Sequence, residues 1–240
     1  MIARTTFRNI SYLLYCLLFL VTACEQIATL RAQQYFNQAK KYYDEGNYSK
    51  AMETCDYALT FDPTFLDALT LKGMIYYQTG SYKNSLEWIR KAVTQKPDDK
   101  QLRMILIDAL FKAERYESAI KQIQFLLANN PNDSELNFLY YYAHIKSRSD
   151  ALIGKIQNEL RTIINKGSED HRFYCLVAEL EILKGDLSQA KTILLEHYTP
   201  HPVWRGTMLL LADAFRANGD YANVVDIYNT IAEKADDKKA

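Results

Sequence analysis

Small, apolar and turn-forming residues recur along this chain of 240 residues with a period of 34. The repeated pattern is a Gly-x-Tyr turn, then two small residues seven apart, then a proline. It occurs first as Gly46, Tyr48, Ala51, Ala58 and Pro63, and again as Gly80, Tyr82, Ser85, Ala92 and Pro97. A period of this length indicates supersecondary units that bury their apolar faces against their neighbours. We therefore expect one continuous helical array without a second domain.

The residue types at these positions have physical reasons. Helices commonly end in a left-handed residue, and Gly46, Gly80, Gly185 and Gly219 can adopt that conformation without steric cost. Alanine at Ala51, Ala119 and Ala190 lets two backbones approach closely. Proline has no amide donor, so Pro63, Pro97 and Pro131 are expected to stop the second helix of each unit.

Extending this pattern along the chain gives six repeat units, over 32–65, 66–99, 100–133, 134–170, 171–204 and 205–238. Each resembles a tetratricopeptide repeat, a hairpin in which a small residue stands where the first helix meets the second. That position is held by Ala39, Gly73, Ala178 and Ala212, and by the bulkier Ile107 and Tyr141 in units three and four. The resemblance implies an all-α fold, a tetratricopeptide-repeat α-solenoid of six helix-turn-helix units spanning 32–238.

The fourth unit is irregular. Ser147 to Asp150 replaces the glycine turn, and the spacing to unit five grows by three residues, most simply through an insertion between the two helices. The second helix is expected to bury apolar residues at helical spacing, namely Ile153, Ile156, Leu160, Ile163 and Ile164.

The N-terminal segment has the layout of a secretory signal peptide. Arg4 and Arg8 precede an apolar run over 10–21, and small residues precede Cys24. The run is too short to span a bilayer comfortably. We expect residues 1–23 to be a signal peptide. An uncleaved anchor helix and a plain signal peptide with a chance cysteine are the alternatives.

The sequence Val21-Thr22-Ala23-Cys24 also resembles the lipobox of bacterial lipoproteins, in which the cysteine receives acyl chains of the palmitate type. The resemblance implies lipidation at Cys24. Because Glu25 and not Asp follows the cysteine, it also implies an outer-membrane location facing the periplasm. Residues 24–31 would then be a lipidated tether, whose seven residues after the cysteine reach about 25 Å when extended and about 10 Å when helical.

Charge and cysteine content narrow the function further. The chain has 29 basic and 29 acidic residues, without a basic stripe, and this balance argues against a nucleic-acid partner. Cys55 and Cys175 fall in units one and five, too far apart for the roughly 7 Å between α-carbons that a disulfide requires. They are expected to be small core residues, although Cys175 could instead line the inner surface.

Catalytic and metal-binding motifs are missing from the sequence. It has no phosphate-binding glycine loop, no nucleophile elbow and no paired Cys-x-x-Cys. The pairs His171 and Cys175, and His197 and His201, are spaced by four residues, but a metal site needs further ligands. We expect no catalytic residue, no metal site and no cofactor, and His144 is expected to pack in the core.

The tetratricopeptide resemblance implies a ligand surface, because in that family the first helices line the concave side. The family's peptide-contacting positions select an aromatic- and methionine-rich set from the first four units: Phe36, Lys40, Tyr43, Met74, Tyr77, Met104, Asp108, Phe111, Phe138 and Tyr142. Such a surface suits an apolar or amphipathic segment. The alternative is that residues such as Tyr43, Tyr77 and Phe111 pack between helices and meet no ligand.

The C-terminal end offers a second candidate surface. Repeat arrays usually finish with a polar capping helix, and few residues remain after unit six. We therefore expect Val224, Tyr228 and Ile231 to be exposed and available for a partner or for self-association, unless local side chains shield them.

These features favour a lipid-anchored protein-protein interaction module that assists assembly of an envelope machine. The architecture resembles the pilotins of type IV pili and the Tad pilus lipoproteins. A scaffold or regulator of cell-wall enzymes is one alternative, and an enzyme subunit of envelope metabolism, with Asp108, Glu179 and Asp213 as its scattered polar candidates, is another. The partner and the oligomeric state are not determined by the sequence.

Overall fold

The computed structural model describes residues 25–148 and 150–236, and the described chain is helical, with no strand among these residues. The predicted signal peptide and Cys24 lie outside the described residues. The chain divides between Arg115 and Tyr116 into two compact units, here called unit N and unit C. None of the described helices is long and apolar enough to cross a membrane.

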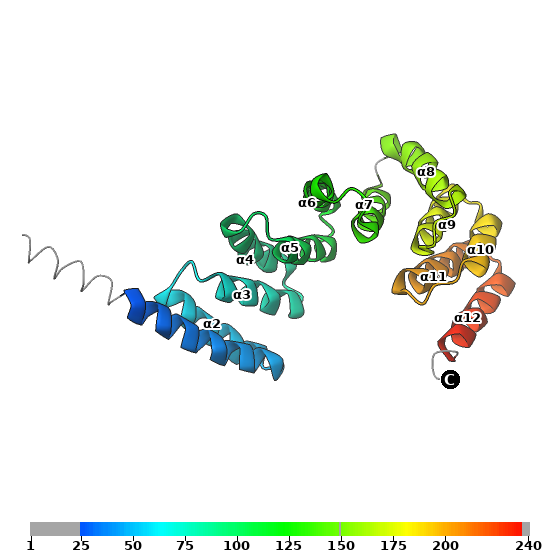
Figure 1. The fold of residues 1–240 in the computed structure, drawn as a ribbon. Helices are drawn as coiled ribbons and strands as arrows, with labels where there is room; N and C mark the ends of the chain where they lie inside the picture. The colour runs from blue at the N-terminus through cyan, green and yellow to red at the C-terminus, as the bar shows by residue number, and fades with distance from the viewer. Residues whose placement is uncertain (1–24, 149, 237–240) are drawn as a thin grey trace, which may run out of the picture. The chain divides into compact units, whose positions relative to one another are not determined.

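Unit N contains a helix over residues 25–44 and four further helices (Figure 1). These are α2 (Tyr48–Phe61), α3 (Leu66–Gln78), α4 (Tyr82–Gln95) and α5 (Lys100–Lys112). The first helix and α2 pack through alanine, because Ala39, Ala51 and Ala58 are fully buried in one cluster. Residues 25–31 belong to this first helix, so the described part of the predicted tether is helical.

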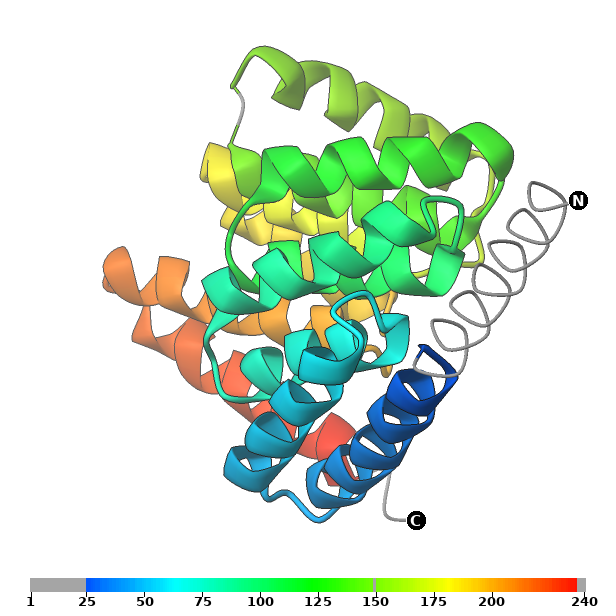
Figure 2. The same ribbon diagram turned by 90° about the vertical axis from the view of Figure 1, so that its left-hand side faces the viewer.

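Unit C contains seven helices, and Figure 2 shows them as the green to red part of the chain. They are α6 (Tyr116–Asn129), α7 (Ser134–Ser147), α8 (Asp150–Asn165), α9 (Arg172–Lys184), α10 (Leu187–Glu196), α11 (Pro202–Ala217) and α12 (Tyr221–Asp236). Two apolar clusters form its core, one around Leu160, Phe173 and Leu176, the other around Met208 and Leu211.

The turns within the hairpins have the left-handed conformation that the glycines predict. Gly46, Gly80, Gly185 and Gly219 have φ between 74° and 86°. At the first of these turns the amide of Asn47 donates to the carbonyl of Tyr42 at 2.8 Å, and the amide of Gly46 donates to Tyr43 at 2.9 Å. This pair of bonds satisfies carbonyls that the helix end leaves without partners.

The irregular fourth repeat differs from the expectation. Only residues 148 and 149 separate α7 from α8, so the extra residues do not lie in the hairpin turn. They lengthen α8, which has 16 residues against 14 in α4, and the connection 166–171 before α9. The insertion is tolerated there because Gly167, with a φ of 77°, turns the chain after α8. The predicted buried face of α8 is present, with Ile156 and Leu160 in the core and Ile153, Ile163 and Ile164 packed against it.

The expected exposure of Val224 and Ile231 is wrong. Together with Ile227, these residues form the face of α12 that packs into the second cluster of unit C, and they are 7% and 8% exposed. The i, i+3, i+7 spacing places them on the side of α12 that faces α11. The last helix is therefore shielded on its apolar face by its own hairpin partner. Tyr228 lies on another face and is 43% exposed.

Candidate functional site: a groove in each unit

Each unit has an open pocket lined by the first helices of its hairpins. In unit N the pocket has a volume of about 520 Å³ and lies among the helix 25–44, α3 and α5. In unit C it has a volume of about 600 Å³ and lies among α7, α9 and α11. We call these the N groove and the C groove. Both are on the side where the tetratricopeptide resemblance places ligands.

The N groove combines aromatic, aliphatic and charged side chains. Four of the predicted contact residues line it, namely Phe36, Lys40, Tyr43 and Met74. Phe36 is held by an edge-on contact with Phe65, at 5.3 Å between ring centroids, and Tyr43 contacts Tyr48 at 5.6 Å. These ring contacts already restrict the side chains of the wall. The side chains therefore lose less conformational entropy when a ligand binds.

Acidic residues accompany the aromatic ones in the N groove. Asp44, Asp67 and Asp99 line it beside Lys40 and Lys96. Asp99 is engaged locally, since its carboxylate caps α5 by accepting from the amides of Gln101 and Leu102. The groove therefore offers polar groups of both signs around an apolar floor, the arrangement that fits an amphipathic segment.

The C groove has an aromatic wall from α7. Phe138 and Tyr142 stack at 5.9 Å, and the ring of His201 meets Phe138 edge-on at 5.8 Å. The guanidinium of Arg172 lies 4.6 Å from the centroid of Phe138. Phe138 is only 4% exposed, so it supports the wall from behind, whereas Tyr142 is half-buried and more accessible.

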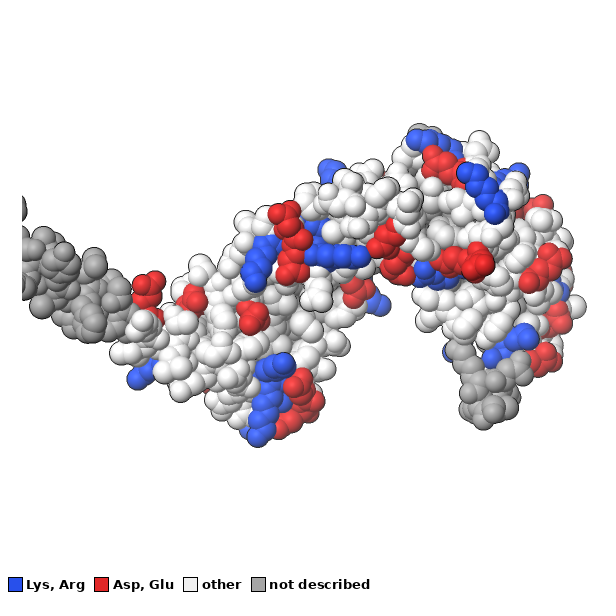
Figure 3. Space-filling view, in the orientation of Figure 1, with Lys and Arg blue, Asp and Glu red and all other residues white. Residues whose placement is uncertain are grey.

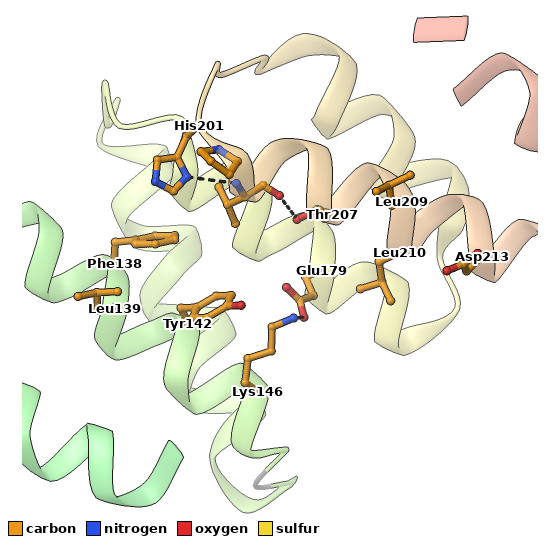
Figure 4. Close-up of a pocket in the computed structure, with 13 residues that line it drawn as sticks. Phe138, Leu139, Tyr142, Lys146, Glu179, His201, Thr207, Leu209, Leu210 and Asp213 are labelled. Atoms are coloured by element: carbon orange, nitrogen blue, oxygen red, sulfur yellow. Dashed lines mark hydrogen bonds and ion pairs between the residues drawn. The ribbon is translucent and has the colours of Figure 1, made fainter. Parts of the chain in front are cut away.

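An ion pair between a buried carboxylate and a half-buried ammonium sits between the two walls of the C groove. Lys146 donates to the carboxylate of Glu179, whose side chain is only 7% exposed (Figure 4). The ammonium of Lys146 also lies 5.2 Å from the ring centroid of Tyr142. Burial and the charge of Glu179 raise the pKa of Tyr142, so its hydroxyl stays protonated at neutral pH. Removing either member of such a pair would leave an uncompensated charge.

Side chains of α11 form the opposite wall. Figure 4 shows Leu210 and Thr207 across the groove from Tyr142 and Asp213 farther along α11, and Leu209 also lines the groove. Gly206 also lines the groove, and a β-carbon there would meet no atom within 4 Å. The glycine therefore leaves open space at a point where any side chain would narrow the groove.

The remaining predicted contact residues of unit N do not line its groove. Met104 and Phe111 are half-buried, and Asp108 is exposed. Tyr77 packs edge-on against Tyr82 at 5.7 Å, and burial followed by a hydrogen bond with Asp108 raises its pKa. Ligand contact at these four positions stays a prediction.

The sequence prediction missed the half of the C groove that the fifth and sixth repeats, 171–204 and 205–238, supply. The predicted contact residues come only from the first four repeats. The same five family positions select ten residues in the fifth and sixth repeats, and four of these line the C groove, namely Glu179, Gly206, Leu209 and Asp213. The signal was therefore present in the sequence. His201 and Leu210 lie outside these positions, and only the structure places them in the wall.

Each of the four histidines contacts a neighbouring ring or backbone group. His201 caps α11, because its Nδ1 accepts from the amide of Val203 at 3.2 Å. His197 stacks on Tyr174 at 3.6 Å between ring centroids, and Nδ1 of His171 lies 2.9 Å from the carbonyl oxygen of Tyr198. His144 is buried against Tyr140. Within the described residues, no three His, Cys, Asp or Glu side chains are grouped as a metal site would require.

Both described cysteines are buried core residues. Cys55 and Cys175 are 0% exposed and unpaired. Burial raises the pKa of each thiol to about 12, so neither is a thiolate at neutral pH. The inner-surface alternative for Cys175 is wrong, because α9 packs this side chain into the second cluster of unit C.

Figure 3 shows basic and acidic side chains mixed over the visible face of each unit. Several are joined in ion pairs, such as Lys72 with Asp56 and Lys91 with Glu87 at 2.9 Å. The ammonium groups of Lys72 and Lys91 each lie 3.9 Å from the ring centroid of Trp88. These charges hold α2, α3 and α4 together and are satisfied within unit N.

Comparisons with known proteins agree with this geometry. A family model for anaphase-promoting complex, cyclosome, subunit 3 matches residues 44–126. No curated protein matches the sequence. Among solved structures, YrrB, described as a TPR protein with an unusual peptide-binding site, has a TM-score of 0.54 at 18% identity, over 72% of this chain and 89% of its own. The chain has the tetratricopeptide-repeat fold.

Two further solved structures share this tetratricopeptide-repeat fold. PilW, described as a widely conserved type IV pilus biogenesis factor, has a TM-score of 0.57 at 16% identity, over 83% of this chain and 91% of its own. PilF of Pseudomonas aeruginosa has a TM-score of 0.52 at 14% identity, over 86% of this chain and 92% of its own. At such identities the likeness concerns the fold.

Proposed function

We propose that this tetratricopeptide-repeat protein is a protein-protein interaction module that binds apolar or amphipathic segments of a partner in its N and C grooves. The observation that carries the proposal is the composition of the two grooves. Each joins an aromatic wall on the first helices to a small number of charged groups. Pockets of this kind bind through apolar burial and gain orientation from a few polar contacts.

The setting we propose is the periplasmic face of the outer membrane, with Cys24 carrying the lipid. The supporting features are the basic, apolar and small-residue segments before Cys24. Two or more acyl chains would hold the protein stably at the membrane, whereas a single chain is only marginal. The shared fold of PilW and PilF favours assistance in assembling an envelope machine, such as a type IV or Tad-type pilus or a secretion system.

The C groove can be tested by filling it. Gly206→Leu places a side chain in open space within the groove, and leucine also favours the helical conformation of α11. The matched control is Gly154→Leu in α8, where a β-carbon likewise meets no atom within 4 Å but the groove is untouched. Crosslinked pull-downs from envelope extracts should lose specific partners with Gly206→Leu and retain them with Gly154→Leu.

The N groove allows a parallel test. Thr70 lines the groove and its hydroxyl donates to the carbonyl four residues earlier, while Thr60 makes the same local bond on an exposed face of α2. Thr70→Arg should therefore reduce partner recovery, and Thr60→Arg should not. Equal recovery of every partner from Gly206→Leu, Thr70→Arg and the two controls would contradict binding in the grooves.

The membrane setting is tested separately by Cys24→Ala. This variant should lose metabolic labelling with fatty acid and leave the outer-membrane fraction. Retention of the unlabelled variant in that fraction would contradict a lipid anchor on Cys24 without affecting the groove proposal.

A further inference from the structure

The first turns of the helix 25–44 expose large aliphatic side chains. Ile27 is 57% exposed and Leu30 is 61% exposed. The first buried residue of this helix is Ala32, at 1% exposure. Residues 25–30 are helical, yet none of them is buried. Two large aliphatic groups therefore stand in contact with solvent on a helix end that has little packing.

Ile27 and Leu30 are exposed because the contacts of α2 with the first helix do not extend to residues 25–30. Phe61, the last residue of α2, stacks on Tyr35 at 5.6 Å with nearly parallel rings. The guanidinium of Arg31 lies 5.5 Å from the centroid of Phe61. These contacts of α2 with the first helix begin at Arg31, so residues 25–30 extend past this layer. A single helical turn without packing is marginally stable in water, because little tertiary contact compensates its lost entropy.

The side chains beside this helix end are those that membrane interfaces favour. Tyr57 is 48% exposed and contacts Tyr35 at 5.5 Å between ring centroids. Arg31 is exposed on the next turn after Ile27. Tyrosine is enriched at the headgroup level of bilayers, and arginine can extend its charge to the headgroups while its aliphatic stem remains in apolar surroundings.

The position of the helix in the chain identifies lipid as the occupant. Residue 25 directly follows Cys24 and the apolar run 10–21. A lipidated cysteine and an uncleaved anchor would both bring residue 25 to the bilayer surface. At 1.5 Å per residue, Ile27 and Leu30 lie about 3 and 7.5 Å along the helix axis from residue 25. Both side chains therefore lie within about 7.5 Å of residue 25, which is comparable to the depth of about 5–10 Å that the apolar faces of interfacial helices reach.

We propose that the first turns of the helix 25–44 enter the boundary between lipid headgroups and acyl chains, where Ile27 and Leu30 contact lipid. This inference rests on the proposed membrane anchor and adds a second, protein-based contact to it. An acyl chain alone leaves the attached protein free to rotate and tilt. Burial of two side chains of this helix would restrict the orientation of unit N relative to the bilayer.

The experiment uses single cysteines along one face of the helix in the mature, lipidated protein. Ile27→Cys, Gln34→Cys and Lys41→Cys lie seven residues apart, so they share a face at increasing distance from residue 25. Leu30→Cys adds a second position near the membrane. An environment-sensitive fluorophore should label these exposed cysteines selectively. Cys16 would be removed with the signal peptide, Cys24 would be acylated, and Cys55 and Cys175 are buried. The protein is reconstituted in vesicles of phosphatidylethanolamine and phosphatidylglycerol with and without spin-labelled lipid.

Probes at 27 and 30 should shift their emission to the blue and lose intensity with spin-labelled lipid, the probe at 34 should respond less, and the probe at 41 should not respond. Flotation of the vesicles reports anchoring independently. Protein that floats with vesicles while probes at 27 and 30 behave like the probe at 41 would overturn the lipid contact alone. Protein that fails to float would overturn the anchor and this inference together.

Discussion

At the scale of single residues, the contact between the two helices of a hairpin depends on side-chain size. Ala39, Ala178 and Ala212 occupy this contact and are fully buried. Gly73 occupies it in the hairpin of α3 and α4, where an added β-carbon would lie 2.5 Å from Cγ1 of Ile89. The close approach of these helices therefore requires the absence of a side chain.

Gly73→Ala should destabilise the protein even though alanine favours helices. The clash with Ile89 predicts an overpacking cost of about 1–3 kcal/mol, against a helix-propensity gain of about 1 kcal/mol. Gly154→Ala in α8 is the control and should gain about 0.5–1 kcal/mol, because its β-carbon enters open space. Urea unfolding measures both changes. A Gly73→Ala variant that gains as much stability as Gly154→Ala would show that Ile89 moves aside freely.

The charge of the Asp170 carboxylate predicts that the stability of the protein depends on pH. Burial opposes ionisation of Asp170, but hydrogen bonds from Arg172 and Ser134 outweigh it and lower its pKa to about 2. A carboxyl group with a pKa below its unfolded value of about 3.9 contributes stability above that value and loses it as the pH falls toward the folded pKa. The loss should therefore fall between about pH 4 and pH 2.

Arg172→Gln should reduce this acid-dependent loss, because it removes the main partner of Asp170. The free energy of unfolding is compared at pH 5 and pH 3, with the exposed Arg205→Gln as control. An unchanged difference between the two pH values in Arg172→Gln would show that Asp170 is not responsible.

At the scale of elements, the hairpin turns all need one left-handed residue, and two of them lack glycine. Glu114 and Arg148 have φ of 54° and 50°, at the places where other hairpins have glycine. Side chains in this conformation cost roughly 1–2 kcal/mol. The hairpin geometry is therefore retained in these turns against a local penalty, because packing of the flanking helices outweighs it.

Glu114→Gly should stabilise the protein by about 0.5–1 kcal/mol, the strain released less the added flexibility of the unfolded chain. Gly185→Ala, at a φ of 86°, should destabilise it by about 1 kcal/mol or more. Glu117→Gly, three residues on and inside α6, is the control and should destabilise by about 1 kcal/mol. The midpoints of denaturant unfolding of the three variants and the wild type measure these changes in stability. Loss of stability in Glu114→Gly would mean that its side chain contributes more than its strain costs.

At the scale of the molecule, packing is local along the chain. Within each unit, the helices in contact are neighbours or next-but-one neighbours in sequence. Stability in such arrays is approximately a sum of repeat and nearest-neighbour terms, so a local defect need not spread. The division into unit N and unit C is consistent with regional opening.

Hydrogen exchange of Gly73→Ala should therefore show faster exchange in α3 and α4, while α9 to α12 keep wild-type protection. The reason is that Gly73 and Ile89 belong to unit N alone. Peptide-level mass spectrometry resolves the two regions. Uniform acceleration over both units would indicate that the chain unfolds as one cooperative body.

Much of the fold and part of the grooves could be predicted from the sequence. The all-α fold and the glycine turns followed from the 34-residue period. For the N groove, the family positions select Phe36, Lys40, Tyr43 and Met74, which line the pocket, and their contact with a ligand stays a prediction. For the C groove, Phe138 and Tyr142 were selected, but their partners on α9 and α11 were not. The exposure of Val224 and Ile231 and the place of the insertion near α8 were predicted wrongly.

The sequence alone determined the helical hairpins, because turn conformation and helix periodicity depend on residues within a few positions of one another. Tertiary structure decided which surfaces remain open. Glu179 becomes the buried partner of Lys146 only when α7 and α9 pack side by side, and α12 covers Val224 and Ile231 only through its hairpin with α11. Burial depends on neighbours far along the chain, and local patterns of hydrophobic and polar residues do not specify how those neighbours fill the space between helices.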